Sequence, residues 1–194
     1  YYDPSLNEIV FPASILQPPF FDAEADDAVN FGAIGAVIGH EISHGFDDQG
    51  SRYDAQGNLR DWWTPEDRAR FEALTARLVD QYGRYEPLAG YRLNGRQTLG
   101  ENIADNAGLA IAYQAWRLSL GGEEAPVIDG LSGEQRFFHG WARVWRSKWR
   151  DERLIEQIKA GVHAPGEFRA NGTVRNQGPF HEAFGVAPGD AMYL

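Results

Sequence analysis

Two histidines and a glutamate occur within five residues, in the segment His40-Glu41-Ile42-Ser43-His44. Residues four apart on a helix lie one above the other, so His40 and His44 can offer two imidazole nitrogens to one metal ion. Glu41 flanks the same edge and is placed to act as a general base. Zinc binds imidazole and carboxylate readily, and a catalytic zinc keeps three protein ligands and a water. The segment therefore predicts a zinc site that still lacks one protein ligand.

The residues before this segment indicate a buried helix. Ile34, Val37 and Ile38 stand at helical spacing within a lead-in of apolar and small residues, 31–39. The alternative is two surface histidines on a helix. A buried imidazole needs a polar partner, which a metal ion would supply, so we favour the metal site.

A second segment, residues 100–106, supplies candidates for the missing ligand and for its support. Glu101 and Asp105 share one face of a predicted helix that begins near Thr98. Glu101 is the expected third ligand, although a carboxylate in the first turn also suits the positive end of a helix. A ligating imidazole usually donates its other N–H to a carboxylate, a role that fits Asp105. Asp47 either orients His44 in the same way or is a solvated turn residue.

The elements that must position these residues are mostly helices. Residues 1–25 are expected to be extended, with a short strand at 9–11, and the histidines to lie on a helix over 28–46. Thr64 and Pro65 are typical of a helix start, and Ser132 of another. The predicted helices span 65–85, 98–120, 132–148 and 152–160, and residues 161–194 are expected to form helical turns at most. The fold class is thus mainly α with a small β-sheet (α+β), in a single domain, 1–194.

The composition excludes several classes of function. A net charge of -10 argues against a nucleic-acid partner, and the one basic cluster, Arg143 to Arg153, is expected to be a solvated face of a helix. The absence of cysteine excludes a thiolate metal site and a cysteine nucleophile. No apolar run approaches the roughly 18 residues of a membrane span, so we expect no membrane contact by this segment.

Several stretches together resemble the neprilysin-like zinc endopeptidases (family M13). The resemblance covers nearly the whole chain, and its motifs lie at residues 9–13, 15–21, 40–48, 61–64, 99–106 and 162–169. It implies a zincin, or thermolysin-like, catalytic domain with one Zn²⁺ held by His40, His44 and Glu101. Glu41 would be the general base, and Asp105 would orient a ligand histidine.

The resemblance also gives roles to residues that the sequence alone ranks as ordinary. His163 matches a histidine that stabilises the oxyanion of the tetrahedral intermediate, and Arg169 matches an arginine that grips the peptide near the scissile bond. An apolar pocket for the side chain after the cleaved bond would be lined by Ile15, Phe20, Val37, Val144 and Trp145. Apart from the resemblance, each of these five is more simply a core residue.

The chain departs from the family at its ends and at two internal positions. Relatives carry an Asn-Ala pair before the residues that match Tyr1-Tyr2, a large N-terminal portion and a longer C-terminal tail. We therefore expect a catalytic-domain fragment. Arg77 and Arg146 stand where animal relatives have cysteines, which favours a bacterial origin.

The expected function is zinc-dependent endopeptidase cleavage of oligopeptides on the amino side of hydrophobic residues. The alternatives are a non-catalytic or weakly active zinc-binding fragment and an aminopeptidase of the zincin class. Expected partners are peptide substrates and the missing N-terminal portion of the parent protein. An exported location, periplasmic, extracellular or membrane-anchored through the parent protein, is favoured over the cytoplasm.

Overall fold

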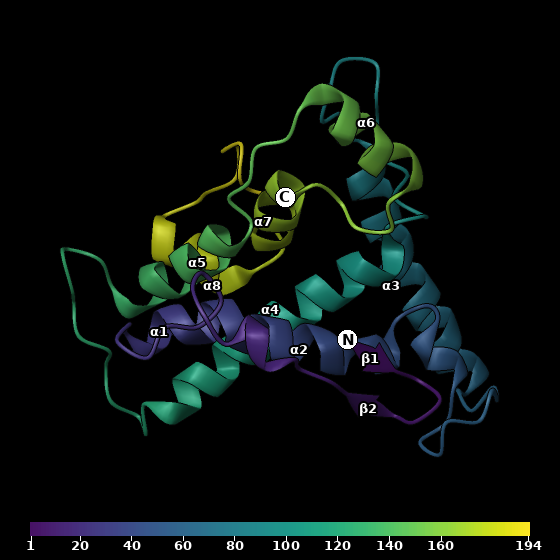
Figure 1. Ribbon diagram of the computed structural model, residues 1–194, viewed down its shortest axis with the longest axis horizontal. Helices are drawn as coiled ribbons and strands as arrows, with labels where there is room; N and C mark the ends of the chain where they lie inside the picture. The colour runs from purple at the N-terminus through teal and green to yellow at the C-terminus, as the bar shows by residue number, and fades with distance from the viewer.

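The computed structural model describes residues 1–194 and consists of helices with one small sheet (Figure 1). The sheet has two antiparallel strands, β1 (Tyr2–Asp3) and β2 (Glu8–Ile9), with Tyr2 opposite Ile9. The predicted strand at 9–11 is thus shorter and begins one residue earlier. Pro12 has no N–H to extend a ladder, and the 3-10 turn η1 (Ala13–Ile15) follows it.

The histidine segment lies in one continuous helical run, as predicted. The run comprises α1 (Asp27–Asn30), a π-helical turn η2 (Phe31–Gly35), α2 (Ala36–Ser43) and a final 3-10 turn η3 (His44–Phe46). π-Helical turns occur mostly singly, as bulges within α-helices, and often near functional sites. A further short turn, η4 (Gly50–Arg52), follows it.

The long helix α4 (Leu99–Ser119) packs against α2, and these two helices contact each other more extensively than any other pair of elements. The two cross in the middle of the molecule (Figure 1). Gly121 and Gly122, just beyond α4, adopt positive φ, a conformation that glycine tolerates and that ends the helix as expected.

Two helices begin with the predicted caps. Thr64 accepts a hydrogen bond from the Asp67 amide at the start of α3 (Pro65–Gly83). Ser132 and Gln135 form a reciprocal capping box at the start of α5 (Gly133–Val144). The predicted end of this last helix at residue 148 is wrong, because Trp145 leaves the helix and its ring lies against Arg169.

The residues after α5 correct two further predictions. The basic cluster 143–153 is not a helix face, since it runs through a connection into α6 (Asp151–Ala160). The C-terminal part holds two helices, α7 (Gly166–Val174) and α8 (Gly178–Phe184), rather than helical turns at most. Most of its Gly and Pro residues stand at helix ends, where they are compatible with helix formation.

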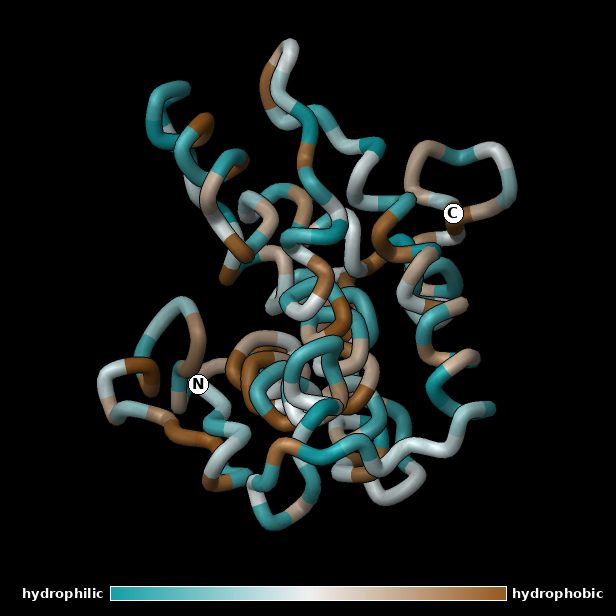
Figure 2. The backbone as a smooth tube through the Cα atoms, turned by 90° about the vertical axis from the view of Figure 1, so that its right-hand side faces the viewer, coloured by the Kyte–Doolittle hydropathy of each residue, from teal (hydrophilic) through white to brown (hydrophobic).

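The main hydrophobic core lies where α4, α5 and the first part of the histidine run meet. Its largest fully buried side chains are Trp116, Trp141, Phe137 and Leu109. A smaller cluster around Tyr82, Leu93, Ile158 and Ala164 joins α3 to α6 and the segment before α7. Figure 2 shows hydrophobic and hydrophilic stretches interleaved along most helices, as expected of helices that bury one face. None of the helices has the length and apolarity needed to cross a bilayer.

Candidate active site

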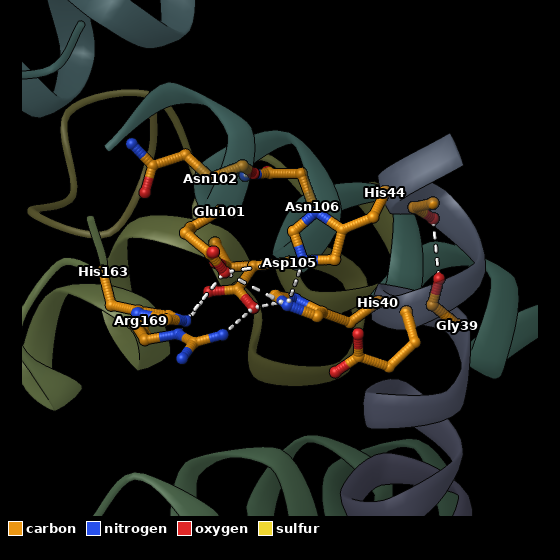
Figure 3. A network of polar contacts seen from close by, with 12 residues as sticks. Gly39, His40, His44, Glu101, Asn102, Asp105, Asn106, His163 and Arg169 are labelled. Atoms are coloured by element: carbon orange, nitrogen blue, oxygen red, sulfur yellow. Dashed lines mark hydrogen bonds and ion pairs between the residues drawn. The ribbon is translucent and has the colours of Figure 1, made fainter. Parts of the chain in front are cut away.

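Three side chains from two crossing helices bring their ligand atoms together. His40 and His44 project from the histidine run, and Glu101 from the first turn of α4 (Figure 3). The two imidazole Nε2 atoms are 2.9 Å apart, and Glu101 Oε2 lies 3.2 Å from His40 Nε2 and 3.6 Å from His44 Nε2. The predicted third ligand therefore meets the paired histidines.

The spacing and chemistry of these atoms fit a zinc ion. Ligands about 2.1 Å from a tetrahedral zinc are about 3.4 Å from one another, close to the three separations seen here. Glu101 Oε2 is buried and receives no hydrogen bond of good geometry, although imidazole nitrogens surround it. A cation shared with the imidazoles would satisfy this oxygen. Glu101 also lies in the first turn of α4, where a carboxylate suits the positive end of the helix, so its position is compatible with both roles considered for it.

His40 is oriented from behind by a buried carboxylate. Its Nδ1 lies 2.7 Å from Asp105 Oδ1, which directs Nε2 toward Glu101. Burial by itself disfavours the imidazolium, but the hydrogen bond to Asp105 and the close contact with Glu101 outweigh it and raise the pKa of His40 to about 9. The cluster thus favours positive charge at the place where its ligand atoms meet.

Asp105 is in turn held by Arg169, which comes from α7. The guanidinium donates from Nε to Asp105 Oδ2 at 2.7 Å and from Nη2 to Oδ1 at 2.6 Å. Burial raises the pKa of Asp105, yet the Arg169 charge and hydrogen bonds outweigh it and lower that pKa. Asp105 is 1% exposed and Arg169 8% exposed, so this is a buried ion pair rather than a surface contact. The sequence alone ranks Arg169 as an ordinary residue and gives no local signal of this burial.

His44 is oriented by a local carboxylate. Its Nδ1 lies 2.7 Å from Asp47 Oδ2. The other oxygen of Asp47 accepts hydrogen bonds from the backbone N–H groups of Gln49 and Gly50. Asp47 therefore faces the imidazole and also shapes the turn, but it is buried rather than solvated, with 6% of its surface exposed.

His163 stands beside the cluster, on the connection between α6 and α7. Its Nε2 is 2.9 Å from Glu101 Oε2, and its side chain is 45% exposed. Burial would raise the pKa of Glu101, but the contacts with His163 and His40 outweigh this and hold that pKa well below its ordinary value. His163 thus combines contact with the cluster and access to solvent.

Glu41 borders two hollows next to the cluster. The larger, about 390 Å³, is also lined by His40, His44, Glu101 and His163. The smaller, about 110 Å³, is also lined by His40, Glu41 and His163. A carboxylate in this position can exchange a proton with a water molecule in the larger hollow.

The smaller hollow includes three of the five predicted pocket residues, Phe20, Val37 and Trp145. Ile15 and Val144 are half-buried but are not among its lining residues. Trp141 lines it and was missed, although its place one turn before Trp145 in a Trp-rich segment was the available signal. Arg169 closes one wall, with its guanidinium 3.8 Å from the centroid of the Trp145 ring.

The chain is similar to known proteins both in sequence and in fold. The chain is 47% identical to endothelin-converting enzyme 1 of Bos taurus, over 99% of this chain and 26% of that protein. It is also 47% identical to neprilysin of Homo sapiens, over 95% of this chain and 25% of that protein. The inhibitor complex of the zinc metalloprotease Zmp1 from Mycobacterium tuberculosis superposes with a TM-score of 0.98 at 56% identity, covering 100% of this chain and 30% of that one.

The chain therefore spans about a quarter of the length of the curated relatives it matches. The resemblance drawn from the motifs is confirmed, as is the fold class, mainly α with a small sheet in the manner of a zinc metallopeptidase catalytic domain. The model of peptidase family M13 matches residues 1–194. With every residue inside that match, this chain belongs to peptidase family M13.

Proposed function

We propose that the protein is a zinc-dependent metalloendopeptidase. The observation that supports this most directly is the meeting of His40 Nε2, His44 Nε2 and Glu101 Oε2 from two crossing helices. These residues would hold one Zn²⁺, which when bound lowers the pKa of a water molecule toward about 7 and polarises the peptide carbonyl. Membership of family M13 supports the same reaction.

Glu41 would act as the general base. It follows the ligand His40 directly, is half-buried, and borders the larger hollow beside the ligand atoms. Its carboxylate would accept a proton from the attacking water and then deliver that proton to the leaving amine. A positioned base of this kind contributes typically about 10²- to 10⁴-fold in rate.

His163 and Arg169 would contact the substrate. The exposed part of His163 lets its imidazole donate a hydrogen bond to the developing oxyanion, an interaction worth about 3 kcal/mol. Arg169 uses Nε and Nη2 for Asp105, which leaves Nη1 as the donor for a peptide carbonyl at the wall of the smaller hollow. Arg169 would therefore orient Asp105 and grip the peptide at once.

The smaller hollow would select the residue after the cleaved bond. Phe20, Val37, Trp141 and Trp145 give it an apolar wall, and it adjoins both His40 and Glu41. A hydrophobic side chain seated there would place its own amide bond beside the ligand atoms. This supports cleavage on the amino side of hydrophobic residues.

Replacement of Glu41 by Gln tests the reaction. We expect Glu41→Gln to retain one zinc per chain by elemental analysis and to lose about 10²- to 10⁴-fold in kcat. Glu72→Gln, an exposed glutamate of α3, is the matched control and should keep full activity. Cleavage by Glu41→Gln at the wild-type rate would remove Glu41 from its role.

An internally quenched peptide blocked at both ends is the substrate for this assay. Its cleavage, with new N-termini at hydrophobic residues, would exclude an aminopeptidase and a merely zinc-binding module. No cleavage by a zinc-loaded wild-type protein would favour the weakly active or non-catalytic alternative.

We also propose peptides as the main partners, with the longer polypeptide of this family as the setting in which the cleft works. Comparing the cleavage rate of residues 1–194 with that of the longer protein would test the second point. Export from the cytoplasm stays a prediction, which cell fractionation would check.

A further inference from the structure

The backbones of α2 and α4 touch at two glycines. A Cβ added to Gly39 would lie 2.5 Å from Gly108 O and 2.9 Å from Gly108 Cα. One added to Gly108 would overlap the His40 backbone nitrogen and lie 2.7 Å from His40 Cα. Carbon atoms in ordinary contact are about 3.5–4.0 Å apart, so neither helix has room for a methyl group here. Only two residues without side chains permit this approach.

The contact lies at the ligand atoms along both helices. Gly39 immediately precedes His40, and Gly108 lies one turn beyond Asp105 on the face of α4 that also carries Glu101. All the atoms that an added Cβ would meet at either glycine belong to the backbone, which cannot rotate away as a long side chain can. A methyl group would therefore push the helices apart where the histidines face the carboxylates.

We propose that Gly39 and Gly108 are positioning residues that set the separation of α2 and α4 and thereby the spacing of the metal ligands. This rests on the proposed metal site. A shift of about 1 Å would restore normal carbon contact, and it is large beside ligand separations of 2.9–3.6 Å. It would also lengthen the 2.7 Å contact between His40 Nδ1 and Asp105 Oδ1, which crosses the same gap.

The test uses Gly39→Ala and Gly108→Ala with two readouts. Zinc affinity, measured by competition with a chromophoric chelator, should fall about 10- to 100-fold, as for other changes that disturb ligand orientation. In metal-free protein, the proton NMR signal of the His40–Asp105 hydrogen bond should weaken or shift. The second readout needs neither metal nor activity, so it tests the positioning role even if the protein proves not to be a peptidase.

Two glycines supply matched controls. Gly35 lies one turn before Gly39 in the same helical run, and a Cβ there would meet the Phe31 side chain at an ordinary 3.6 Å. Gly35→Ala should leave both readouts unchanged and raise the melting temperature, because alanine favours helix over glycine. A Cβ added to Gly140, on α5, would approach the Val29 backbone as closely as one added to Gly39 would approach Gly108. Gly140→Ala should lower stability but keep zinc affinity and the His40 signal.

The outcomes separate positioning from general folding. Loss of zinc affinity and of the His40 signal in folded Gly39→Ala or Gly108→Ala, with both preserved in Gly140→Ala, would support the proposal. Unchanged affinity and signal in the folded variants would overturn it. Failure of both variants to fold would also overturn it, since the glycines would then serve the fold as a whole.

Discussion

The two histidines of the cluster present the same nitrogen to Glu101 but are held in different ways. Each turns Nδ1 to an aspartate at 2.7 Å. The partner of His40 is Asp105, 65 residues away on another helix and paired with a buried arginine. The partner of His44 is Asp47, three residues further along, whose second oxygen accepts backbone N–H groups of the following turn.

The two hydrogen bonds have equal length, but the one to His40 depends on packing between helices and the one to His44 on a single local turn. Asp105 and Arg169 neutralise each other away from water, so loss of either leaves an uncompensated buried charge. Asp47 is solvated by backbone dipoles of its own turn, so the turn can survive without the charge. We therefore expect Asp105 and Arg169 to contribute more to the free energy of unfolding than Asp47 does. The main effect of Asp47 should be to orient the His44 imidazole.

Replacing Asp105 by Asn should have the largest effect. Asp105→Asn leaves the buried Arg169 unpaired, and we expect the free energy of unfolding to fall by about 3–5 kcal/mol. Urea denaturation of the metal-free protein would measure it. Asp80→Asn is the control, because Asp80 also pairs with an arginine but on the exposed face of α3, where such pairs contribute at most about 1 kcal/mol. If Asp105→Asn and Asp80→Asn lowered the free energy of unfolding equally, the buried pair would contribute no more than an exposed one, and the contrast with Asp47 would fail.

Removal of the metal should have an intermediate effect. With free zinc at about 100 times its Kd, binding stabilises the folded state by about 2.7 kcal/mol, which EDTA would remove. The Asp105–Arg169 pair needs no metal, so we expect the protein to stay folded. Hydrogen exchange should then accelerate at residues 47–50 more than around His40. If exchange accelerated equally at residues 47–50 and around His40, the metal would stabilise the two regions to the same extent.

Replacing Asp47 by Asn should cost the least stability, about 1 kcal/mol. The amide oxygen of Asp47→Asn can still accept from Gln49 and Gly50, while its NH₂ group replaces the oxygen that faces His44. His44 would then be favoured in the wrong tautomer, and zinc affinity should fall about 10- to 100-fold. Asp47→Ala, which also loses the turn bonds, should be less stable than Asp47→Asn. An unchanged zinc affinity in Asp47→Asn would show that the orienting contact is dispensable.

Local patterns predicted the helices well where the signals lie within one or two turns. The starts of α3 and α5 follow from Thr64 and Ser132, whose side chains cap the next turn. These patterns did not predict the end of α5 or the existence of α7 and α8. Trp145 leaves its helix toward Arg169, and most Gly and Pro residues after position 160 mark helix ends rather than loops.

The candidate site was predictable to the same extent. The pairing of His40 with His44 follows from helical periodicity, and Glu101 with Asp105 from the same rule on another helix. His163 and Arg169 carried no local signal, and their roles came from resemblance to a family. Ile15 and Val144 share a sequence neighbourhood with pocket residues, yet the fold does not place them at the smaller hollow.

The amino-acid sequence by itself determined that two imidazoles share one edge of a helix, because a period of 3.6 residues leaves no other arrangement for positions four apart. It also determined the helix starts, which depend on hydrogen bonds within a single turn. Only the tertiary structure decided that Glu101 and Asp105 meet the imidazoles, how deeply Arg169 is buried, and how closely α2 approaches α4. Those features join residues about 60 or more positions apart, and their separation depends on packing between helices rather than on any local preference.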